Sequence, residues 1–469
     1  MRILFQLAFP GYLRMYGSTV RLLAERGHRV LLAYDQPEKR RDDVTVAALE
    51  AVENVELVRP LPLPRRPGEA GIERLRATAD YLHYLDPRFA DAPYLRRRLD
   101  KYLDGRLRMF AGWRYGHPLG RPALRLALAL EHLVPSDRGV ERALSALSPD
   151  VVVVSPLIGR SPANRRQTDT VKAARRLGIP TGFAVASWDH LTTKGVLKAQ
   201  ADAAFVWNDI QRRDAADIHR VPPQRVAVTG AQLFDHWFDR RPSATRSEFA
   251  AAVGLASDRY LLYVGSSPNV APAEREIAFV RDWVQALRQS RRPPLREVGV
   301  LVRPHPYSVS DWAEVDLSAL GGAVAPRTPP HLPMDADDEA LYFHSIHFAS
   351  AVVGINTSAM LESFVQRRPV LTIRSPAFRE TQTGTPHFRE LRAAAGGALA
   401  NATTVDEHLA QLEEVLDRPE RTAEQIDAFL RAFLRPHGLD RPATPILADA
   451  IEALGRSRRA SSGQTGARA

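Results

Sequence analysis

Two kinds of hydrophobic pattern alternate along the first half of the chain. Short and nearly continuous runs of Val, Ile, Leu and Ala are followed, in most cases, by stretches with apolar residues every three or four positions. Such runs are typical of parallel strands buried on both faces, and such stretches of amphipathic helices. The runs lie at residues 2–9, 28–34, 55–61, 150–156, 179–186, 202–208 and 225–230. The alternation predicts an α/β fold with a doubly wound parallel sheet.

The pattern pauses and then starts again in the second half of the chain. Further strands are predicted at 259–267, 298–306, 350–356 and 369–374, with a weaker one at 396–402, and helices at 272–289, 337–348, 357–367 and 404–434. A chain of 469 residues is too long for one ordinary core. We therefore expect two Rossmann-like domains facing a cleft, because open α/β sheets bind ligands at the carboxyl ends of their strands.

The predicted domain boundaries follow from where the pattern is lost. The first domain is expected at 1–235, a linker at 236–258 and the second domain at 259–440. A helix at 441–454 follows a Pro-containing loop, and we expect it to cross back to the first domain. The polar, Gly/Ser/Arg-rich tail at 455–469 is expected to be disordered.

Residues 62–145 interrupt the strand–helix rhythm and predict a helical insertion within the first domain. The region 59–142 has 17 Arg and Lys against 10 Asp and Glu, a net charge of +7 in a chain whose total is +10. Its interleaved Tyr and apolar residues suggest peripheral contact with an anionic membrane, and a simple helical subdomain is the alternative. Nucleic acid is not expected as a partner, because no known binding motif accompanies the charge.

Composition excludes several classes of site. The chain has no Cys, so disulfides, thiolate metal sites and Cys nucleophiles are absent. No apolar run reaches the length of a membrane-spanning helix, and the N-terminus reads as a strand rather than a signal peptide, so a cytoplasmic location is expected. The chain has no G-x-G-x-x-G, P-loop, H-E-x-x-H or nucleophile elbow. The acidic DADD segment at 335–338 is better explained by acids at a helix start than by a metal site.

The segment GINTSAMLE (354–362) carries the most informative polar residues of the second half. Asn356, Thr357 and Ser358 fall where a helix begins, and the free N–H groups of a first turn favour an anion. Glu362 lies one turn further on the same face, where a carboxylate could accept from the hydroxyls of a ribose. These residues therefore predict a diphosphate and ribose site. Simple N-capping with a solvated Glu362 is the alternative.

Two further clusters follow strands of the second half. In LVRPHP (301–306), Arg303 and His305 bring a cation and an adjustable hydrogen-bond donor to the end of a strand. In YVGSSPN, the small residues Gly265, Ser266 and Ser267 allow close backbone approach to a ligand. We predict that both clusters border a ligand in the cleft, although strand-end salt bridges and ordinary turns produce similar patterns.

Two loops of the first half supply candidates for the acceptor side. Gly11 follows the first strand, and SWDHLTTKG (187–195) gathers Trp188, Asp189, His190 and Lys194 after a later strand. Asp189 or His190 could serve as a general base, and Lys194 could hold a charged acceptor. A polar loop anchored by its Trp is the alternative explanation.

The chain resembles the two-domain GT-B glycosyltransferases in the order of five segments. These are VTGAQLFD, YVGSS, VRPHP, VVGINTSAMLE and RPVLTIR. The resemblance spans about residues 150–385 and is nearest to the bacterial branch around the non-hydrolysing UDP-N-acetylglucosamine 2-epimerases and the cell-envelope polyol-phosphate transferases. The N-terminal strand and loop fit the resemblance less sharply, and the insertion at 62–145 is not covered by it.

The resemblance implies a nucleotide-sugar donor bound mainly by the second domain. Thr357 and Ser358 would face the diphosphate, and Glu362 the ribose. Arg303 and His305 would border the same pocket. The departing diphosphate would be neutralised by the helix start and basic side chains, without a metal or any other cofactor. Asp189 or His190 would take the proton of the acceptor. The acceptor would be a cell-envelope or capsular glycan, a lipid-linked molecule or a secondary metabolite.

The motif also departs from the epimerase pattern. Epimerases carry Ser-Gly-Gly before the glutamate, where this chain has the segment 356–359, Asn-Thr-Ser-Ala. The set of first-domain carboxylates that epimerases use is not identifiable here either. We therefore predict a metal-independent glycosyltransferase. A UDP-sugar 2-epimerase and a non-catalytic nucleotide-sugar-binding protein are the alternatives.

Overall fold

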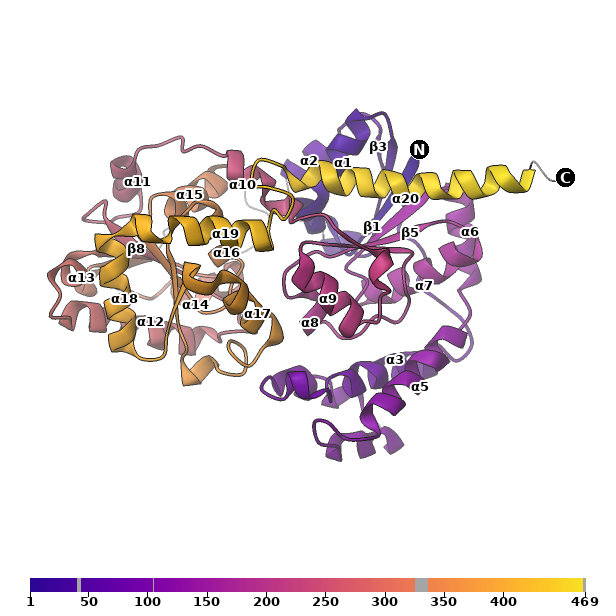
Figure 1. Cartoon of the computed structure of the whole chain (residues 1–469), viewed down its shortest axis with the longest axis horizontal. Helices are drawn as coiled ribbons and strands as arrows, with labels where there is room; N and C mark the ends of the chain where they lie inside the picture. The colour runs from indigo at the N-terminus through magenta and orange to yellow at the C-terminus, as the bar shows by residue number, and fades with distance from the viewer. Residues whose placement is uncertain (40–43, 104, 325–335, 467–469) are drawn as a thin grey trace. The chain divides into compact units, whose positions relative to one another are not determined.

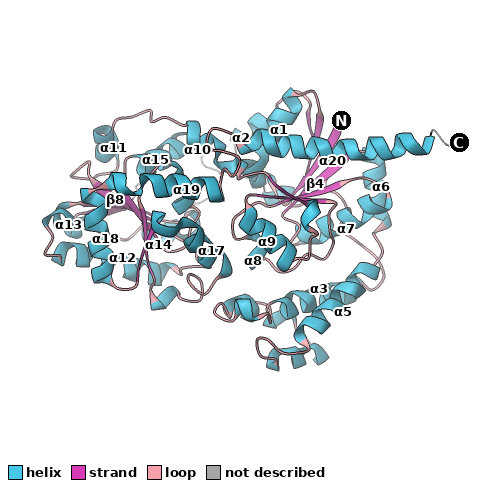
Figure 2. Cartoon of the chain, in the orientation of Figure 1, coloured by secondary structure: helices cyan, strands magenta, loops and turns pink. Residues whose placement is uncertain are grey.

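The computed structural model describes residues 1–39, 44–103, 105–324 and 336–466, and its backbone divides into two units (Figure 1). The first unit comprises Met1–Leu233 together with Phe433–Ala469, and the second comprises Phe234–Ala432. Each unit has its own parallel sheet with helices around it, which Figure 2 shows in magenta and cyan. None of the helices in these ranges is long and apolar enough to cross a membrane.

The first unit is built on a seven-stranded sheet with the order β3-β2-β1-β4-β5-β6-β7, in which all pairs are parallel. Its strands are β1 (Arg2–Leu7), β2 (Arg29–Tyr34), β3 (Val55–Val58), β4 (Val151–Ser155), β5 (Thr181–Ala184), β6 (Ala203–Val206) and β7 (Val226–Val228). Every residue of β4, VVVVS, is buried. This burial on both faces explains why the strands read as continuous apolar runs.

The helices around this sheet are α1 (Leu13–Glu25), α2 (Val44–Glu50), α6 (Arg138–Leu147), α7 (Pro162–Arg176), α8 (His190–Thr193), α9 (Asp209–Asp217) and α20 (Ala443–Gly466). Helix α20 packs on α1 and on the central strands. Its buried Leu447, Ala448 and Ile451 share one core cluster with Phe5 of β1. The helix continues beyond 454, through most of the segment that the sequence predicts to be disordered.

The helical insertion predicted at 62–145 contains α3 (Glu69–His83), α4 (Tyr94–Arg97) and α5 (Gly120–Leu133), with short 3-10 turns between them. Helices α3 and α5 pack side by side. Buried ion pairs join them to α7, because Arg76 lies 2.9 Å from Glu131 and 3.2 Å from Asp169. The insertion is thus held to the first unit by paired charges as well as by apolar contact.

The second unit contains a six-stranded parallel sheet with the order β10-β9-β8-β11-β12-β13. Its strands are β8 (Tyr260–Val264), β9 (Gly299–Arg303), β10 (Gly322–Val324), β11 (Ala351–Gly354), β12 (Val370–Ile373) and β13 (Leu399–Ala402). Its helices are α10 (Asp235–Asp239), α11 (Arg246–Ala252), α12 (Ala273–Gln289), α13 (Pro293–Glu297), α14 (Val309–Trp312), α15 (Ala336–His347), α16 (Ala359–Val365), α17 (Pro386–Ala395), α18 (Val405–Asp417) and α19 (Ala423–Phe433).

The predicted fold class, two doubly wound parallel sheets, is confirmed. Each predicted strand is present, shorter at one or both ends. The edge strand β10 was not predicted, because its three residues are too few to form a pattern. The predicted linker at 236–258 instead contains α11 and nearly all of α10, and both helices lie in the second unit.

Candidate functional site

The candidate donor site lies at the carboxyl edge of the second sheet. Strands β9, β8 and β11 are neighbours, so the segments that follow them emerge side by side. The strand order reverses between β8 and β11, which is the switch point where open α/β sheets bind ligands. The structure thereby brings together three separate sequence motifs: Gly265–Ser267, Arg303–His305 and Asn356–Ser358.

Glu362 is tied to Arg303 through a tyrosine. The Tyr342 hydroxyl of α15 donates to the Glu362 carboxylate, and the Arg303 guanidinium lies 5.1 Å from the centre of the Tyr342 ring. Burial lowers the pKa of Arg303 to about 10, against the opposing effects of Tyr342 and Asp338, so the side chain remains a cation at neutral pH. Glu362 is half-buried and hydrogen-bonded, which argues against a solvated helix residue.

The start of α16 lacks the side-chain cap that the alternative explanation requires. The N-cap residue Ser358 is exposed, and its side chain makes no capping hydrogen bond to this helix. The Asn356 amide instead donates to the Thr381 carbonyl at 2.6 Å and lies 3.3 Å from His387 Nε2. Asn356 therefore holds the strand–helix turn in shape, while Thr357 and Ser358 are the partly and fully exposed residues of the turn.

A buried carboxyl that the sequence analysis missed supports the same edge. Glu276 of α12 accepts from the Ser266 backbone N–H at 2.8 Å and from the Tyr263 hydroxyl at 3.1 Å. Burial raises the pKa of Glu276 to about 7, against the lowering by these two donors. Ser266 Oγ in turn accepts from the Asn356 N–H at 3.3 Å. Glu276 thus fixes the β8 turn, and through Ser266 the β11 turn.

Gly265 has a structural reason of its own. A Cβ atom at this position would lie 2.6 Å from the His305 backbone nitrogen and 3.1 Å from the Arg303 carbonyl oxygen. We expected this glycine to let a ligand approach the backbone. In the structure, the backbone of residues 303–305 is what lies close to it. His305 Nδ1 accepts from the Tyr307 N–H at 3.1 Å, so the neutral ring carries its hydrogen on Nε2.

In the first unit, Asp189 lies just before the short helix α8. Its carboxylate accepts from the Ser187 hydroxyl and, at 2.9 Å, from the Thr193 hydroxyl, and Lys194 Nζ lies 3.5 Å away. Asp189 keeps about a quarter of its side-chain surface exposed, at 26%. It is therefore an accessible and well-oriented carboxylate with Lys194 beside it.

His190 occupies a different environment. The side chain is buried, its Nδ1 accepts from the Ala186 N–H at 3.1 Å, and its ring packs edge-on against Phe183. Burial lowers the pKa of His190 to about 4, although Asp189 acts in the opposite direction. These contacts favour a structural role for His190 and leave Asp189 as the better candidate base.

The loop after β1 contains a tyrosine whose pKa is affected by the charge of Asp189. Gly11 belongs to a short turn in which a Cβ atom would lie 2.9 Å from the Phe9 ring, and Tyr12 follows it. Burial, and then Asp189, raise the pKa of Tyr12 to about 12. Gly11 thus precedes a tyrosine that interacts with Asp189, while Trp188 is buried, and an acceptor role for either stays a prediction.

A second buried carboxyl lies at the carboxyl edge of the first sheet, after β2, and was not predicted. Asp35 follows β2 and accepts from Gln6 Nε2 at 2.7 Å and from Gln167 Nε2 at 2.8 Å. Burial raises the pKa of Asp35 to about 7, against the lowering by these amides and by Arg166. The signal in the sequence was a Gln inside the apolar run RILFQLAF.

Among the described residues, no group of three or more His, Asp or Glu side chains could hold a metal ion. Asp335 lies outside the described residues. The three acids that follow it, Asp337, Asp338 and Glu339, stand in the first turn of α15, as predicted for a helix start.

Neither a protein-family model nor a curated protein matches this sequence. Solved structures do match its fold. A UDP-GlcNAc 2-epimerase from Neisseria meningitidis bound to UDP-GlcNAc has a TM-score of 0.53 at 9% identity, over 97% of this chain and 100% of that chain. The enzyme of the same name from Methanocaldococcus jannaschii, in complex with UDP-GlcNAc and UDP, has a TM-score of 0.52 at 12% identity, over 96% and 100%.

The chain has a GT-B-like fold. The resemblance that the motifs suggested is therefore confirmed at the level of the fold, and it extends over nearly the whole chain, including the N-terminal strands that matched less sharply by sequence. At these identities the likeness is one of architecture.

Proposed function

We propose that the protein is a glycosyltransferase that uses a nucleotide-diphosphate sugar and binds it in the second unit. The observation that carries the proposal is the Arg303–Tyr342–Glu362 arrangement beside the exposed turn at the start of α16. A cation, exposed hydroxyls and a fixed carboxylate are the groups that a diphosphate joined to a ribose requires. The fold supports the proposal, because similar folds bind UDP-GlcNAc.

In the proposed reaction, the sugar passes to an acceptor hydroxyl and the nucleotide diphosphate leaves. Arg303 and the turn at Thr357 and Ser358 stabilise the charge that develops on the departing diphosphate, without a required metal or cofactor. Asp189 of the first unit accepts the proton of the acceptor hydroxyl, and Lys194 binds a charged acceptor such as a lipid-linked or envelope glycan precursor.

The test starts from a thermal-shift screen over UDP-, GDP-, CMP-, CDP- and dTDP-linked sugars. Calorimetric titration of the matched nucleotide then compares wild type with Glu362→Gln. We expect affinity to fall about 10- to 100-fold, because a charged hydrogen bond contributes ~1.5–3 kcal/mol. Glu424→Gln, an exposed glutamate of the same unit, is the matched control. Equal affinities in wild type and Glu362→Gln would show that the donor site is wrongly placed.

A double variant, Thr357→Ala with Ser358→Ala, tests the phosphate contacts separately. It should weaken binding of the nucleoside diphosphate more than binding of the bare nucleoside, since the two hydroxyls are proposed to face phosphate. A loss that is equal for both ligands would place these residues elsewhere.

A second candidate function is UDP-sugar 2-epimerisation, which the bound UDP-GlcNAc of the similar epimerase structures favours. The two activities give different products from one incubation. Without acceptor, an epimerase interconverts two nucleotide sugars. A transferase releases free nucleotide slowly without acceptor and rapidly when the acceptor is added. A protein that binds the donor and yields neither product is the non-catalytic alternative.

The insertion supports a location of the reaction at a membrane surface. Helix α5 and the residue before it carry a stripe of exposed leucines, Leu119, Leu126, Leu130 and Leu133, spaced by seven, four and three residues and hence on one helical face. The surrounding region has a net charge of +7. An apolar stripe on a basic element is the combination that binds anionic bilayers, so we propose peripheral binding at the inner membrane face by α5.

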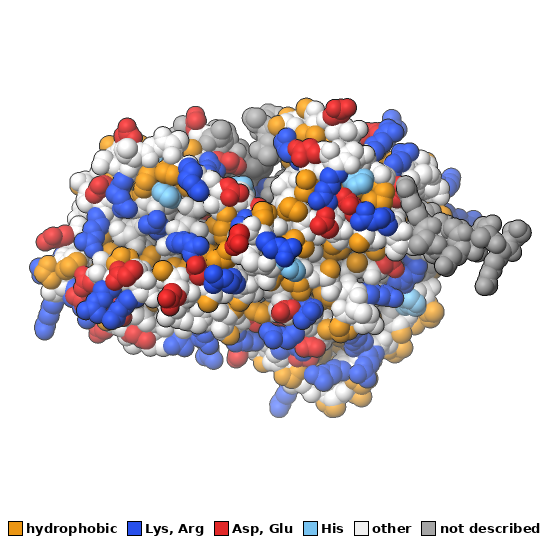
Figure 3. All heavy atoms as spheres, turned by 45° about the horizontal axis from the view of Figure 1, so that its top comes forward, with side chains coloured by type: hydrophobic (Ala, Val, Ile, Leu, Met, Phe, Trp, Pro, Cys, Tyr) orange, Lys and Arg blue, Asp and Glu red, His pale blue; other side chains and the backbone are white. Residues whose placement is uncertain are grey.

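The charge on one face of the molecule does not favour nucleic acid. On the face that Figure 3 shows, Lys and Arg side chains are interspersed with Asp and Glu over both units and form no continuous stripe. A nucleic-acid footprint is usually a basic patch or stripe on one face.

A further inference from the structure

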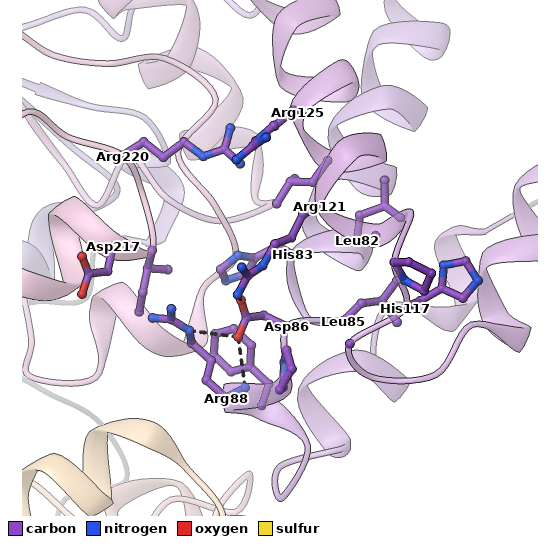
Figure 4. A pocket seen from close by; sticks show the side chains of 17 residues that line it. Leu82, His83, Leu85, Asp86, Arg88, His117, Arg121, Arg125, Asp217 and Arg220 are labelled. Carbon is purple, nitrogen blue, oxygen red and sulfur yellow. Dashed lines mark hydrogen bonds and ion pairs between the residues drawn. The ribbon is translucent and has the colours of Figure 1, made fainter.

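The helical insertion contains a pocket that the proposed donor and acceptor sites do not use. Its volume is about 520 Å³, and its walls come from the end of α3, the start of α5 and the end of α9 (Figure 4). Buried apolar side chains, among them Leu85 and Phe89, form part of the lining. All of the lining residues belong to the first unit.

The charged side chains of the pocket are mostly cations. Four arginines line it, against the two carboxylates of Asp86 and Asp217. Asp86 is already engaged, since its two oxygens lie 3.1 Å from Arg88 Nε and 3.3 Å from Arg121. The single negative charge of Asp86 is thus shared by two arginines, and neither Arg125 nor Arg220 takes part in these ion pairs.

Arg125 and Arg220 point toward one another from different elements, and the Asp217 carboxylate points away from them (Figure 4). Partial burial, and then the repulsion from Arg125, lower the pKa of Arg220. Arg220 also has a φ of 59°, a left-handed backbone conformation that residues other than glycine seldom adopt. Two guanidinium groups that face one another repel, and an anion between them replaces this repulsion with attraction.

His83 provides an independent sign of a ligand. It lines the pocket, is only 4% exposed, and its Nε2 is buried without a hydrogen-bond partner among the described residues. Burial, and then His219, lower the pKa of His83 far below its ordinary value, so the ring is neutral. A buried polar atom of this kind is normally satisfied by protein, water or ligand.

We propose that this pocket binds the phosphoryl group of an anionic ligand, a phosphate monoester or diphosphate with an apolar portion. Arg125 and Arg220 clamp the phosphoryl oxygens, since guanidinium forks match phosphate bidentately. His83 Nε2 hydrogen-bonds to the same group, and the apolar lining near Phe89 takes the adjoining carbon chain. The ligand is either a soluble phosphate or a phosphorylated lipid, which share this chemistry.

The test compares wild type with the double variant Arg125→Gln, Arg220→Gln. Both side chains are exposed, so the fold is expected to survive their replacement. Arg108→Gln, an exposed arginine of the insertion that does not line the pocket, is the matched control. Inorganic pyrophosphate and dihexanoyl phosphatidic acid, below its micellar concentration, are titrated calorimetrically into each protein. The double variant should bind at least about tenfold more weakly, and the control should bind as wild type does.

The two probes also identify the source of the phosphoryl group. Binding of both with similar affinity means that a soluble phosphate suffices, and a marked preference for the phosphatidic acid means a lipid ligand. Equal binding of both probes by wild type and the double variant, or failure of both to bind wild type, would overturn the proposal. Nucleotide-sugar affinity, measured in parallel, should be the same in all three proteins, so failure here leaves the proposed donor site untouched.

Discussion

Glu276 gives the sharpest test of how the candidate site is held together. The perturbation is Glu276→Gln, which keeps an acceptor for the Ser266 N–H and the Tyr263 hydroxyl but removes the ionisable group. Glu274→Gln, two residues earlier and exposed on the same helix, is the matched control. We expect Glu276→Gln to change the dependence of stability on pH rather than to unfold the protein.

The magnitude follows from the pKa of this carboxyl. Glu276 loses its proton near pH 4.5 in the unfolded chain but near pH 7 in the folded protein. Between these values the folded state binds more protons, so the free energy of unfolding falls as the pH rises. The contribution is complete below about pH 4.5 and is lost through about pH 7. At about 1.36 kcal/mol per pH unit, it amounts to about 3 kcal/mol at most.

The assay is guanidinium unfolding of wild type and both variants at pH 5, 6, 7 and 8. The buried Asp35 titrates over a similar range in all three proteins, so its effect cancels in the differences. The free energy of unfolding of Glu276→Gln, relative to wild type, should rise by about 2–3 kcal/mol from pH 5 to pH 8, whereas the Glu274→Gln difference should stay constant. Parallel pH profiles for wild type and Glu276→Gln would refute the reasoning.

Three further predictions concern the proposed activity. Donor binding and turnover should survive EDTA, because Arg303 can neutralise the diphosphate; loss with EDTA and rescue by Mg²⁺ or Mn²⁺ would contradict this. Tyr342→Phe removes the donor to Glu362 and should weaken nucleotide binding about 3- to 10-fold without changing the melting temperature by more than a few degrees, and calorimetry with a melting curve checks both. Leu126→Ser with Leu130→Ser should abolish flotation with anionic vesicles at low salt while leaving donor affinity unchanged; wild type that fails to float would remove the membrane proposal.

The fold was accessible from sequence because both sheets are buried on both faces. Runs such as DVVVVSP have no polar interruption, and the helices between them have a clear period, so strand positions could be assigned without homologues. The strand β10 could not be found, because a three-residue edge strand has no period. The ends of α20 and the first helices of the second unit could not be placed either, because helix boundaries depend on tertiary contacts.

The candidate site was predictable where function places polar residues directly after strands. Arg303 could be singled out at the end of a strand and Glu362 one turn into the helix that follows a strand, but Tyr342, which links them, lies in mid-helix and gave no signal. Glu276 could have been found, because it stands on the buried face of α12, where the other positions are apolar. His190 shows the limit of such reasoning, since a histidine next to an aspartate suggests a base in the sequence, whereas burial of its side chain favours a structural role.

The position of α20 bears on how the protein is made. Its Leu447 and Ile451 complete the core around Phe5, yet they are synthesised after the whole of the second unit. At roughly 5–20 residues per second, translation of residues 234–432 takes on the order of 10 to 40 s. For that time the nascent first unit keeps an uncovered apolar surface, while the second unit, one continuous segment, can fold first. The N-terminal half is therefore the part of the nascent chain that chaperones are expected to hold.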